Sequence, residues 1–218
     1  MNKEWSELNK TMQAQIKKKD TYKMGIDTLF NLRRQLMQTL VSFKEDLCRE
    51  DFNAIPFINA DGYHSRTIAY SIWHIFRIED IVAHTVITED EQVFFTGNYQ
   101  VRINSPIITT GNELVKQQIA DFSKQLNLEE LYSYIFEVRE STEKILERFS
   151  YDELKWKIPD ERKGYLKSLN VVNCDEKAIW LIDYWCSKDI RGLIQMPFSR
   201  HWIMHTEACL RIKNKMHS

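Results

Sequence analysis

Two histidines near the C-terminal end of the chain, His201 and His205, have the spacing of a metal-binding pair. On a helix, residues four apart are offset by about 40° around the axis and about 6 Å along it, so both imidazoles can reach one ion. The residues between them are apolar, which indicates that this part of the helix is largely buried. A buried imidazole needs a polar partner, which is either a metal ion or an acceptor such as a backbone carbonyl or a carboxylate.

A third histidine, His74, lies in the middle of the most apolar segment of the chain. Alone, it would be interpreted as a hydrogen-bonded core residue. Metal sites in helical proteins are built from inward-facing side chains on neighbouring helices, so we expect His74 to join His201 and His205 as the third ligand of one divalent ion. Three imidazoles suit zinc or nickel, with iron and copper as alternatives.

The remaining histidines and the nearby acidic residues are weaker candidates. His64 falls in a predicted loop and His217 lies at the end of the chain. His84 follows His74 by ten residues, which turns it about 80° away on a helix. Carboxylates could orient an imidazole through its second ring nitrogen. Those nearest the predicted helices are Glu79, Asp80, Asp183 and Glu207, and each is also explained as a surface or capping charge.

Aromatic and sulfur-bearing residues also lie close to the three histidines in the sequence. Trp73, Trp185 and Trp202 could line a substrate pocket, but tryptophans at helical spacing are more often part of the core. Cys186 and Cys209 could be interpreted as nucleophiles paired with a histidine. Neither has a local signature of that chemistry, so we expect buried structural thiols.

The elements that must position these residues are predicted to be helices, because only six glycines and four prolines occur in 218 residues. Apolar residues at helical spacing predict four long helices. They cover residues 20–43, 65–87, 112–149 and 197–212, with Ser65 and Asn112 as N-caps, a break near Asn127, and Pro197 in the first turn of the last helix. The second of these is apolar on most of its circumference and should be central.

The connections between these helices contain the turn-forming residues. Residues 51–64 and 96–113 are predicted loops, the second of them with a short stretch that could be extended. The segment 150–196 is polar and turn-rich apart from a short helix around Trp180 to Trp185, which Gly192 is expected to end. We predict one domain over residues 1–218, in which residues 1–19 form a polar N-terminal extension.

Composition and charge exclude several classes of protein. A formal net charge of −1 gives no field that would attract nucleic acid, and Lys17, Lys18 and Lys19 fit a solvated terminal helix. The polar N-terminus does not resemble a signal peptide, and no uncharged run is long enough to span a membrane. The four cysteines are far apart without a CxxC pair, which favours a reducing compartment. These features predict a soluble protein of the cytoplasm.

The order of these segments resembles the DinB/YfiT-like superfamily of metal-dependent proteins. The segments that carry the resemblance are SIWHIFRIED, around His74, and PFSRHWIMHTEACLRI, around His201 and His205, and the likeness spans most of the chain from about Asp20. The resemblance implies an antiparallel four-helix bundle with extra short helices and long loops at one end. It also implies a three-histidine metal site with open positions, and a homodimer. Many members continue the last motif as HxxxHRGQ, whereas Thr206, Glu207 and Ala208 follow here.

Two classes of function follow from this resemblance. The first is a metal-dependent enzyme acting on a small molecule, as a thiol S-transferase with a low-molecular-weight thiol or as a hydrolase. The alternative is a non-enzymatic, stress-related or ligand-binding bundle with a structural or vestigial ion. The sequence offers no catalytic base to go with the three histidines.

Overall fold

The protein is all-helical in the computed structural model, which describes residues 2–217. Within that range no strand is present, and one isolated bridge joins Lys157 to Asp189. The predicted all-α class is therefore confirmed. In chain order, the helices are α1 (Lys3–Gln15), α2 (Tyr22–Asp46), α3 (Arg49–Asn53), η1 (Gly62–His64), α4 (Ile68–Asp80), η2 (Ile81–Thr88), α5 (Val93–Thr96), α6 (Tyr99–Ile103), α7 (Gln117–Gln125), α8 (Leu128–Glu147), η3 (Glu153–Lys155), α9 (Glu161–Ser168), α10 (Glu176–Cys186), α11 (Ile190–Gln195) and α12 (Arg200–Met216).

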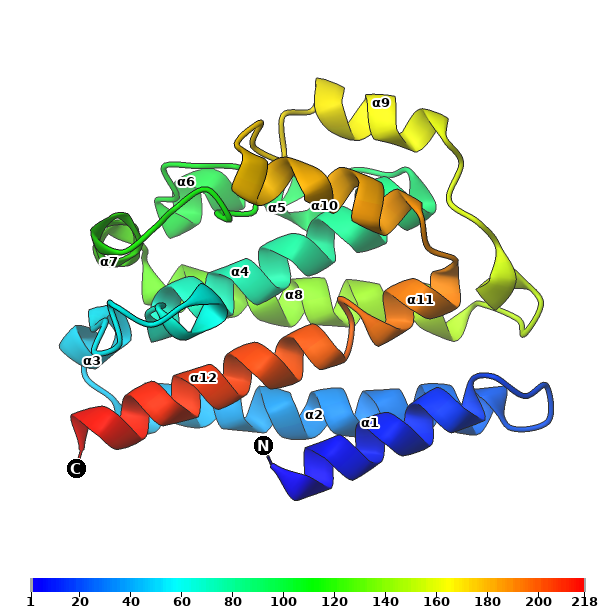
Figure 1. Ribbon diagram of the computed structural model, residues 1–218, viewed down its shortest axis with the longest axis horizontal. Helices are drawn as coiled ribbons and strands as arrows, with labels where there is room; N and C mark the ends of the chain where they lie inside the picture. The colour runs from blue at the N-terminus through cyan, green and yellow to red at the C-terminus, as the bar shows by residue number, and fades with distance from the viewer. Residues whose placement is uncertain (1, 218) are drawn as a thin grey trace.

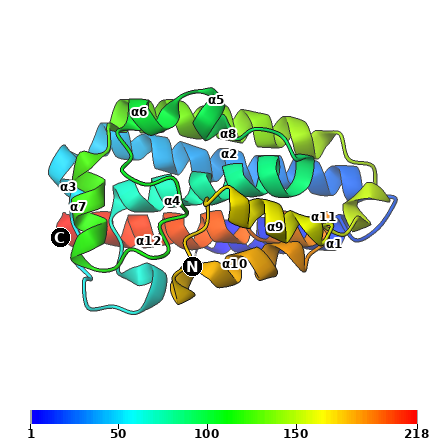
Figure 2. The same cartoon turned by 90° about the horizontal axis from the view of Figure 1, so that it is seen from above.

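Four of these helices, α2, α4, α8 and α12, pack around a shared core. Helices α2 and α4 each contact both α8 and α12. Figure 1 shows that α2 and α12 run in one direction and that α4 and α8 run in the other. The four helices are therefore not antiparallel throughout, because the segment between η2 and α8 returns the chain to the end at which α4 began (Figure 2).

Helix α4 is the central element, as its apolar circumference predicts. Every residue from Ile68 to Asp80 is buried, and the helix contacts α8, α12, α3 and α7. Its N-cap is Thr67, whose side chain accepts a hydrogen bond from the backbone of Tyr70, and not Ser65 as expected. Beyond Asp80 the helix continues as the π-helix η2. Its C-cap is Glu89, whose backbone has a left-handed conformation.

The N-terminal segment differs from the polar extension expected for residues 1–19. Helix α1 packs along α2, with Trp5 and Met12 buried in its interface. The two helices approach so closely that a Cβ atom at Gly25 would lie 2.5 Å from Ile16 Cγ2. Lys17 to Lys19 lie in the exposed turn between the helices and not in a helix. The few apolar residues of the segment are enough to bind it to the core.

The third predicted helix is two helices, α7 and α8. The expected break is confirmed, because Asn127 caps α8 through hydrogen bonds from the backbones of Glu129 and Glu130. Helix α7 begins at Gln117, five residues later than the expected cap at Asn112. The predicted loop over residues 96–113 contains helix α6, so the stretch that could have been extended is helical.

The segment 150–196 covers one flank of the protein and is not confined to one end. Helices α9 and α10 pack on each other and on η2, whereas α3 and α7 lie at one end of the long helices (Figure 1). Helix α10 ends at Cys186, and Gly192 lies inside α11. Helix α12 begins at Arg200, so Pro197 precedes it and does not lie in its first turn. None of the described helices has the length and apolar character needed to cross a membrane.

Candidate metal centre

The structure brings His74, His201 and His205 together. One potential ligand atom from each of the three side chains lies within 4.8 Å of the other two. The ring centroid of His74 lies 5.1 Å from that of His201 and 4.9 Å from that of His205, and the two α12 rings are 4.5 Å apart. The three imidazoles therefore form a group that could hold one metal ion.

Two packed helices produce this arrangement. Helix α12 presents His201 and His205 on one face because they are one turn apart, and α12 packs against α4, which carries His74. All three side chains are almost completely buried, with exposed fractions of 5% for His74, 6% for His201 and 4% for His205. The packing of the two helices thus fixes where the three side chains start.

A loop carbonyl sets the orientation of His74. Nδ1 of His74 lies 2.7 Å from the backbone oxygen of Thr110, and because a carbonyl oxygen can only accept, Nδ1 carries the proton. Nε2 is then the atom with a free lone pair, as a metal ligand requires. The ring also stacks on Tyr70 at 5.3 Å, and the Tyr70 hydroxyl donates to the oxygen of Gly111 at 2.9 Å. The same loop therefore holds both rings.

Burial keeps the three imidazoles neutral near pH 7. It lowers the pKa of His74 to about 4, with the nearby positive charge of Arg66 acting in the same direction. Burial, followed by the neighbouring histidines, holds the pKa of His201 and of His205 well below the ordinary value. Neutral imidazole is the form that binds metal.

The hydrogen bonding of the histidines is also consistent with a bound cation. Nδ1 of His201 and Nδ1 of His205 are buried and have no hydrogen-bond partner among the described residues. Buried polar atoms without partners are costly and uncommon in folded proteins. Three neutral nitrogen donors that face one another satisfy the requirement of a borderline-soft divalent ion such as zinc. The residues present therefore fit the predicted ion.

A cleft of about 460 Å³ is lined by the three histidines and gives small molecules access to them. One wall comes from α10, which contributes Trp180, Tyr184 and Trp185, and Tyr63 and Arg66 also line the space. Of the three tryptophans considered from the sequence, Trp185 lines the cleft, whereas Trp73 and Trp202 are wholly buried in the core. Segment 150–196 thus provides a wall of the cleft.

Of the four acidic candidates, Glu79 connects the helices around the site and does not orient an imidazole. Its carboxylate accepts two hydrogen bonds from Arg33, at 2.7 and 2.9 Å, and one from Trp202 Nε1 at 2.7 Å. Arg33 also donates to the backbone oxygen of Phe198 at 3.1 Å. This buried network joins α2, α4 and the start of α12, the helix that carries His201 and His205.

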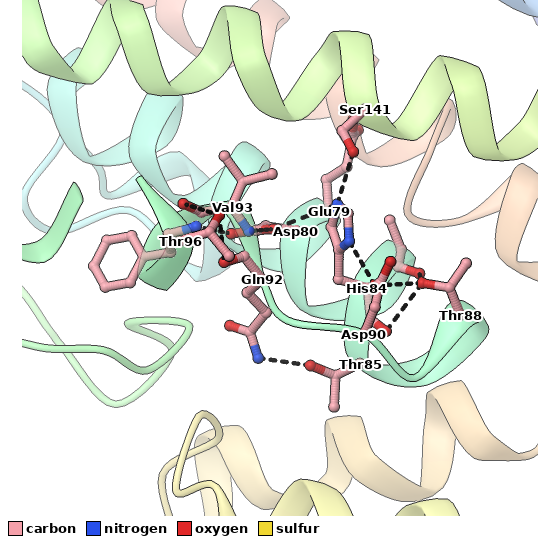
Figure 3. A network of polar contacts seen from close by, with 12 residues as sticks. Glu79, Asp80, His84, Thr85, Thr88, Asp90, Gln92, Val93, Thr96 and Ser141 are labelled. Carbon is pink, nitrogen blue, oxygen red and sulfur yellow. Dashed lines mark hydrogen bonds and ion pairs between the residues drawn. The ribbon is translucent and has the colours of Figure 1, made fainter. Parts of the chain in front are cut away.

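Asp80 and His84 belong to a separate network, shown in Figure 3. The Asp80 carboxylate accepts hydrogen bonds from the backbones of Val93 and Phe94, both at 2.9 Å. Burial raises its pKa. His84 lies 2.7 Å from Asp90 through Nδ1 and 3.0 Å from the Ser141 hydroxyl through Nε2 (Figure 3). Both ring nitrogens of His84 are therefore engaged away from the metal centre.

The other candidates lie outside the site. Asp183 forms an exposed ion pair with Lys163 at 2.8 Å, and Glu207 accepts from the backbone of Asn2 in a groove between α1 and α12. Cys186 and Cys209 are buried, and burial raises the pKa of Cys209 to about 12. A raised pKa favours the protonated thiol, so Cys209 has the environment of a buried structural thiol and not that of an activated nucleophile.

No family model matches the chain, and a search of curated proteins finds no match. The resemblance to the DinB/YfiT-like superfamily therefore depends on the order of the helical segments and on the histidine motifs that they carry.

Proposed function

We propose that this chain is a metal-dependent protein of the DinB/YfiT-like type, in which His74, His201 and His205 hold one divalent ion. Zinc and nickel are the first choices, with iron and copper as alternatives. The observation that carries the proposal is that three neutral, buried imidazoles converge beside a cleft that small molecules can enter. The fold we propose is the four-helix bundle of that superfamily, modified by the parallel neighbours α4 and α8.

The proposed activity is that of an enzyme acting on a small molecule. An ion with three nitrogen ligands and an open position would act as a Lewis acid and lower the pKa of a bound water or thiol. The chain's own residues supply the rest: Thr110 fixes the tautomer of His74, and the aromatic wall from α10 binds the apolar body of a substrate. We place thiol transfer before hydrolysis, on the resemblance to the superfamily.

In thiol transfer, the sulfur of a low-molecular-weight thiol forms a bond to carbon on an electrophile. The leaving group departs with the electron pair of its own bond, and the thiol proton passes to solvent. The proposal includes a homodimer, as the resemblance implies, and a location in the cytoplasm, as the dispersed cysteines indicate. It includes neither nucleic acid nor membrane as a partner.

The test uses untagged protein loaded with zinc or nickel, glutathione or bacillithiol as the thiol, and chlorodinitrobenzene as the electrophile. The thioether should form faster than in buffer, and both His201→Ala and a chelator should abolish the acceleration. His84→Ala is the matched control, because it removes a buried histidine that points away from the centre. Unchanged thioether formation in His201→Ala would contradict the proposal.

The same preparations separate the enzyme from its alternative. An ion that binds only the folded state raises the melting temperature whether or not it is catalytic. A stoichiometric ion that stabilises the protein, with turnover of neither thiols nor ester substrates, would support the non-enzymatic bundle instead.

A further inference from the structure

The cleft beside the three histidines carries positive charge without any acidic residue. Among the described residues that line it, Arg66 is the only one that is an arginine, lysine, aspartate or glutamate. Three neutral histidines leave the charge of a divalent ion uncompensated, so the loaded site and Arg66 together would present three positive charges. Opposite charges attract strongly where protein walls exclude water. The natural occupant of such a space is an anion.

The Arg66 side chain is also available to bind an anion. Its guanidinium donates to the backbone oxygen of Ser65 at 2.9 Å and lies 5.4 Å from the ring centroid of Tyr70. The ion pairs formed by arginines within residues 2–217 involve Arg33, Arg77, Arg102, Arg139, Arg162 and Arg191, and none involves Arg66. A planar guanidinium matches a carboxylate better than any other side chain does, because it can donate two parallel hydrogen bonds.

The position of Arg66 couples it to the metal centre. Arg66 directly precedes Thr67, the N-cap of α4, and lines the same cleft as His74 and His205. A ligand in the cleft can therefore contact Arg66 at one end and the metal centre at the other.

The wall from α10 indicates what lies between those ends. Trp180 and Tyr184 pack edge to face at 5.7 Å, and Trp180 is 49% exposed even though its indole N–H is bonded to the oxygen of Lys177. An exposed indole with its polar atom satisfied offers only apolar surface to the cleft. Aromatic surface of this kind binds apolar or planar groups.

We infer that the cleft takes a small carboxylate with an apolar body, whose carboxylate binds Arg66 while the body lies against Trp180 and Tyr184. The inference depends on the proposed function for the positive charge of the ion and for placing the reacting end of the ligand at the metal centre. Its recognition end is defined by residues that are not metal ligands. Binding can therefore be measured without turnover.

The test is a titration of the zinc-loaded chain with two probes, 4-phenylbutyrate and its neutral amide. The carboxylate should bind roughly tenfold to a hundredfold more tightly than the amide, as expected for hydrogen bonds to a charged group. Arg66→Gln should abolish this preference, and Arg66→Lys should restore part of it. Arg34→Gln, which removes an exposed arginine of α2 outside the cleft, should preserve it.

Each other outcome contradicts the inference. Equal affinity for the two probes, or binding of neither, would show that the cleft does not select an anion. A preference that survives Arg66→Gln but disappears in zinc-free protein would assign the carboxylate to the ion and not to Arg66. A lack of bound zinc would contradict the proposed metal-dependent function and not the inference about the carboxylate. In that case the zinc-free chain should still prefer the carboxylate through Arg66.

Discussion

Nδ1 of His74 lies 2.7 Å from the carbonyl oxygen of Thr110, which is 36 residues away along the chain. Through this hydrogen bond, the backbone of residues 104–116 orients the imidazole of His74. The next residue, Gly111, has a φ angle of 76°, in the left-handed region that favours glycine. The orientation of His74 therefore depends on the backbone conformation at Thr110 and Gly111.

The first prediction concerns this loop. A Cβ atom at Gly111 would lie 2.8 Å from Trp73 Cζ3 and 3.0 Å from Tyr70 Cε2, and the positive φ adds strain. We expect Gly111→Ala to destabilise the fold by about 2 kcal/mol and to weaken zinc binding about tenfold, as loss of an orienting contact does. Urea unfolding and competition with a chelator measure the two effects.

Gly164→Ala is the control for that substitution. Gly164 lies in α9, and a Cβ atom there would meet no other atom within 4 Å. Alanine should stabilise this helix by about 0.5 to 1 kcal/mol without changing zinc affinity. If Gly111→Ala behaved like Gly164→Ala, the loop would not be holding the imidazole.

The second prediction concerns the buried network around Glu79. Glu79→Gln would leave the wholly buried Arg33 without its closest carboxylate and weaken the link to the start of α12. Breaking a buried ion pair from one side costs about 3 to 5 kcal/mol. We expect a loss at the lower end of that range, because the Glu143 carboxylate, 3.1 Å from Arg33 Nε, remains as a partner. Glu140→Gln removes a carboxylate from an exposed pair with Lys144, so it should have little effect on unfolding by urea. Equal losses in the two variants would disprove the structural role of Glu79.

The third prediction concerns pH. In the folded chain the pKa of His74 is about 4, below the ordinary value of 6.5. Between these values the unfolded chain binds a proton that the folded chain does not, so metal-free protein should lose stability as pH falls through that range. His74 alone would account for about 3 kcal/mol, and His201 and His205 act in the same direction.

Urea unfolding of the protein in the presence of a chelator, between about pH 7 and about pH 4, measures this pH dependence of stability. His74→Gln, which cannot titrate in this range, should lose less stability over the same interval than the wild type. Identical pH dependence in the two proteins would mean that His74 is not held neutral by burial.

The fourth prediction concerns α1. Met12 is wholly buried between α1 and α2, so Met12→Ala should destabilise the protein by about 2 to 5 kcal/mol. Lys10→Ala, on the exposed side of the same helix, should change stability little. A small effect of Met12→Ala would restore the interpretation of residues 1–19 as an extension.

Local patterns explain how much of the site could be predicted. The spacing of His201 and His205 is a property of one helix, so sequence alone places both on one face. The encounter with His74 depends on how α12 packs on α4, and it could be expected only from the usual construction of metal sites in helical proteins and from the resemblance. Thr110 could not be found, because it contributes a backbone oxygen that any residue would supply.

The errors in the fold have similar physical causes. The polar composition of residues 1–19 conceals an apolar face made by Trp5, Met12 and Ile16. Turn-forming residues between 96 and 113 suggested a loop, although short helices also begin and end at such residues. The directions of α4 and α8 are set by the long connection between them, which has no local signature.

Zinc content is the most direct test of the central claim. Untagged protein is purified without chelator, equilibrated with zinc, freed of unbound metal and analysed beside His201→Ala and His84→Ala. The three-histidine site predicts about one zinc ion per chain in the wild type and in His84→Ala, and loss of that ion in His201→Ala. A wild-type chain without zinc, or one whose zinc content is unchanged by His201→Ala, would contradict it.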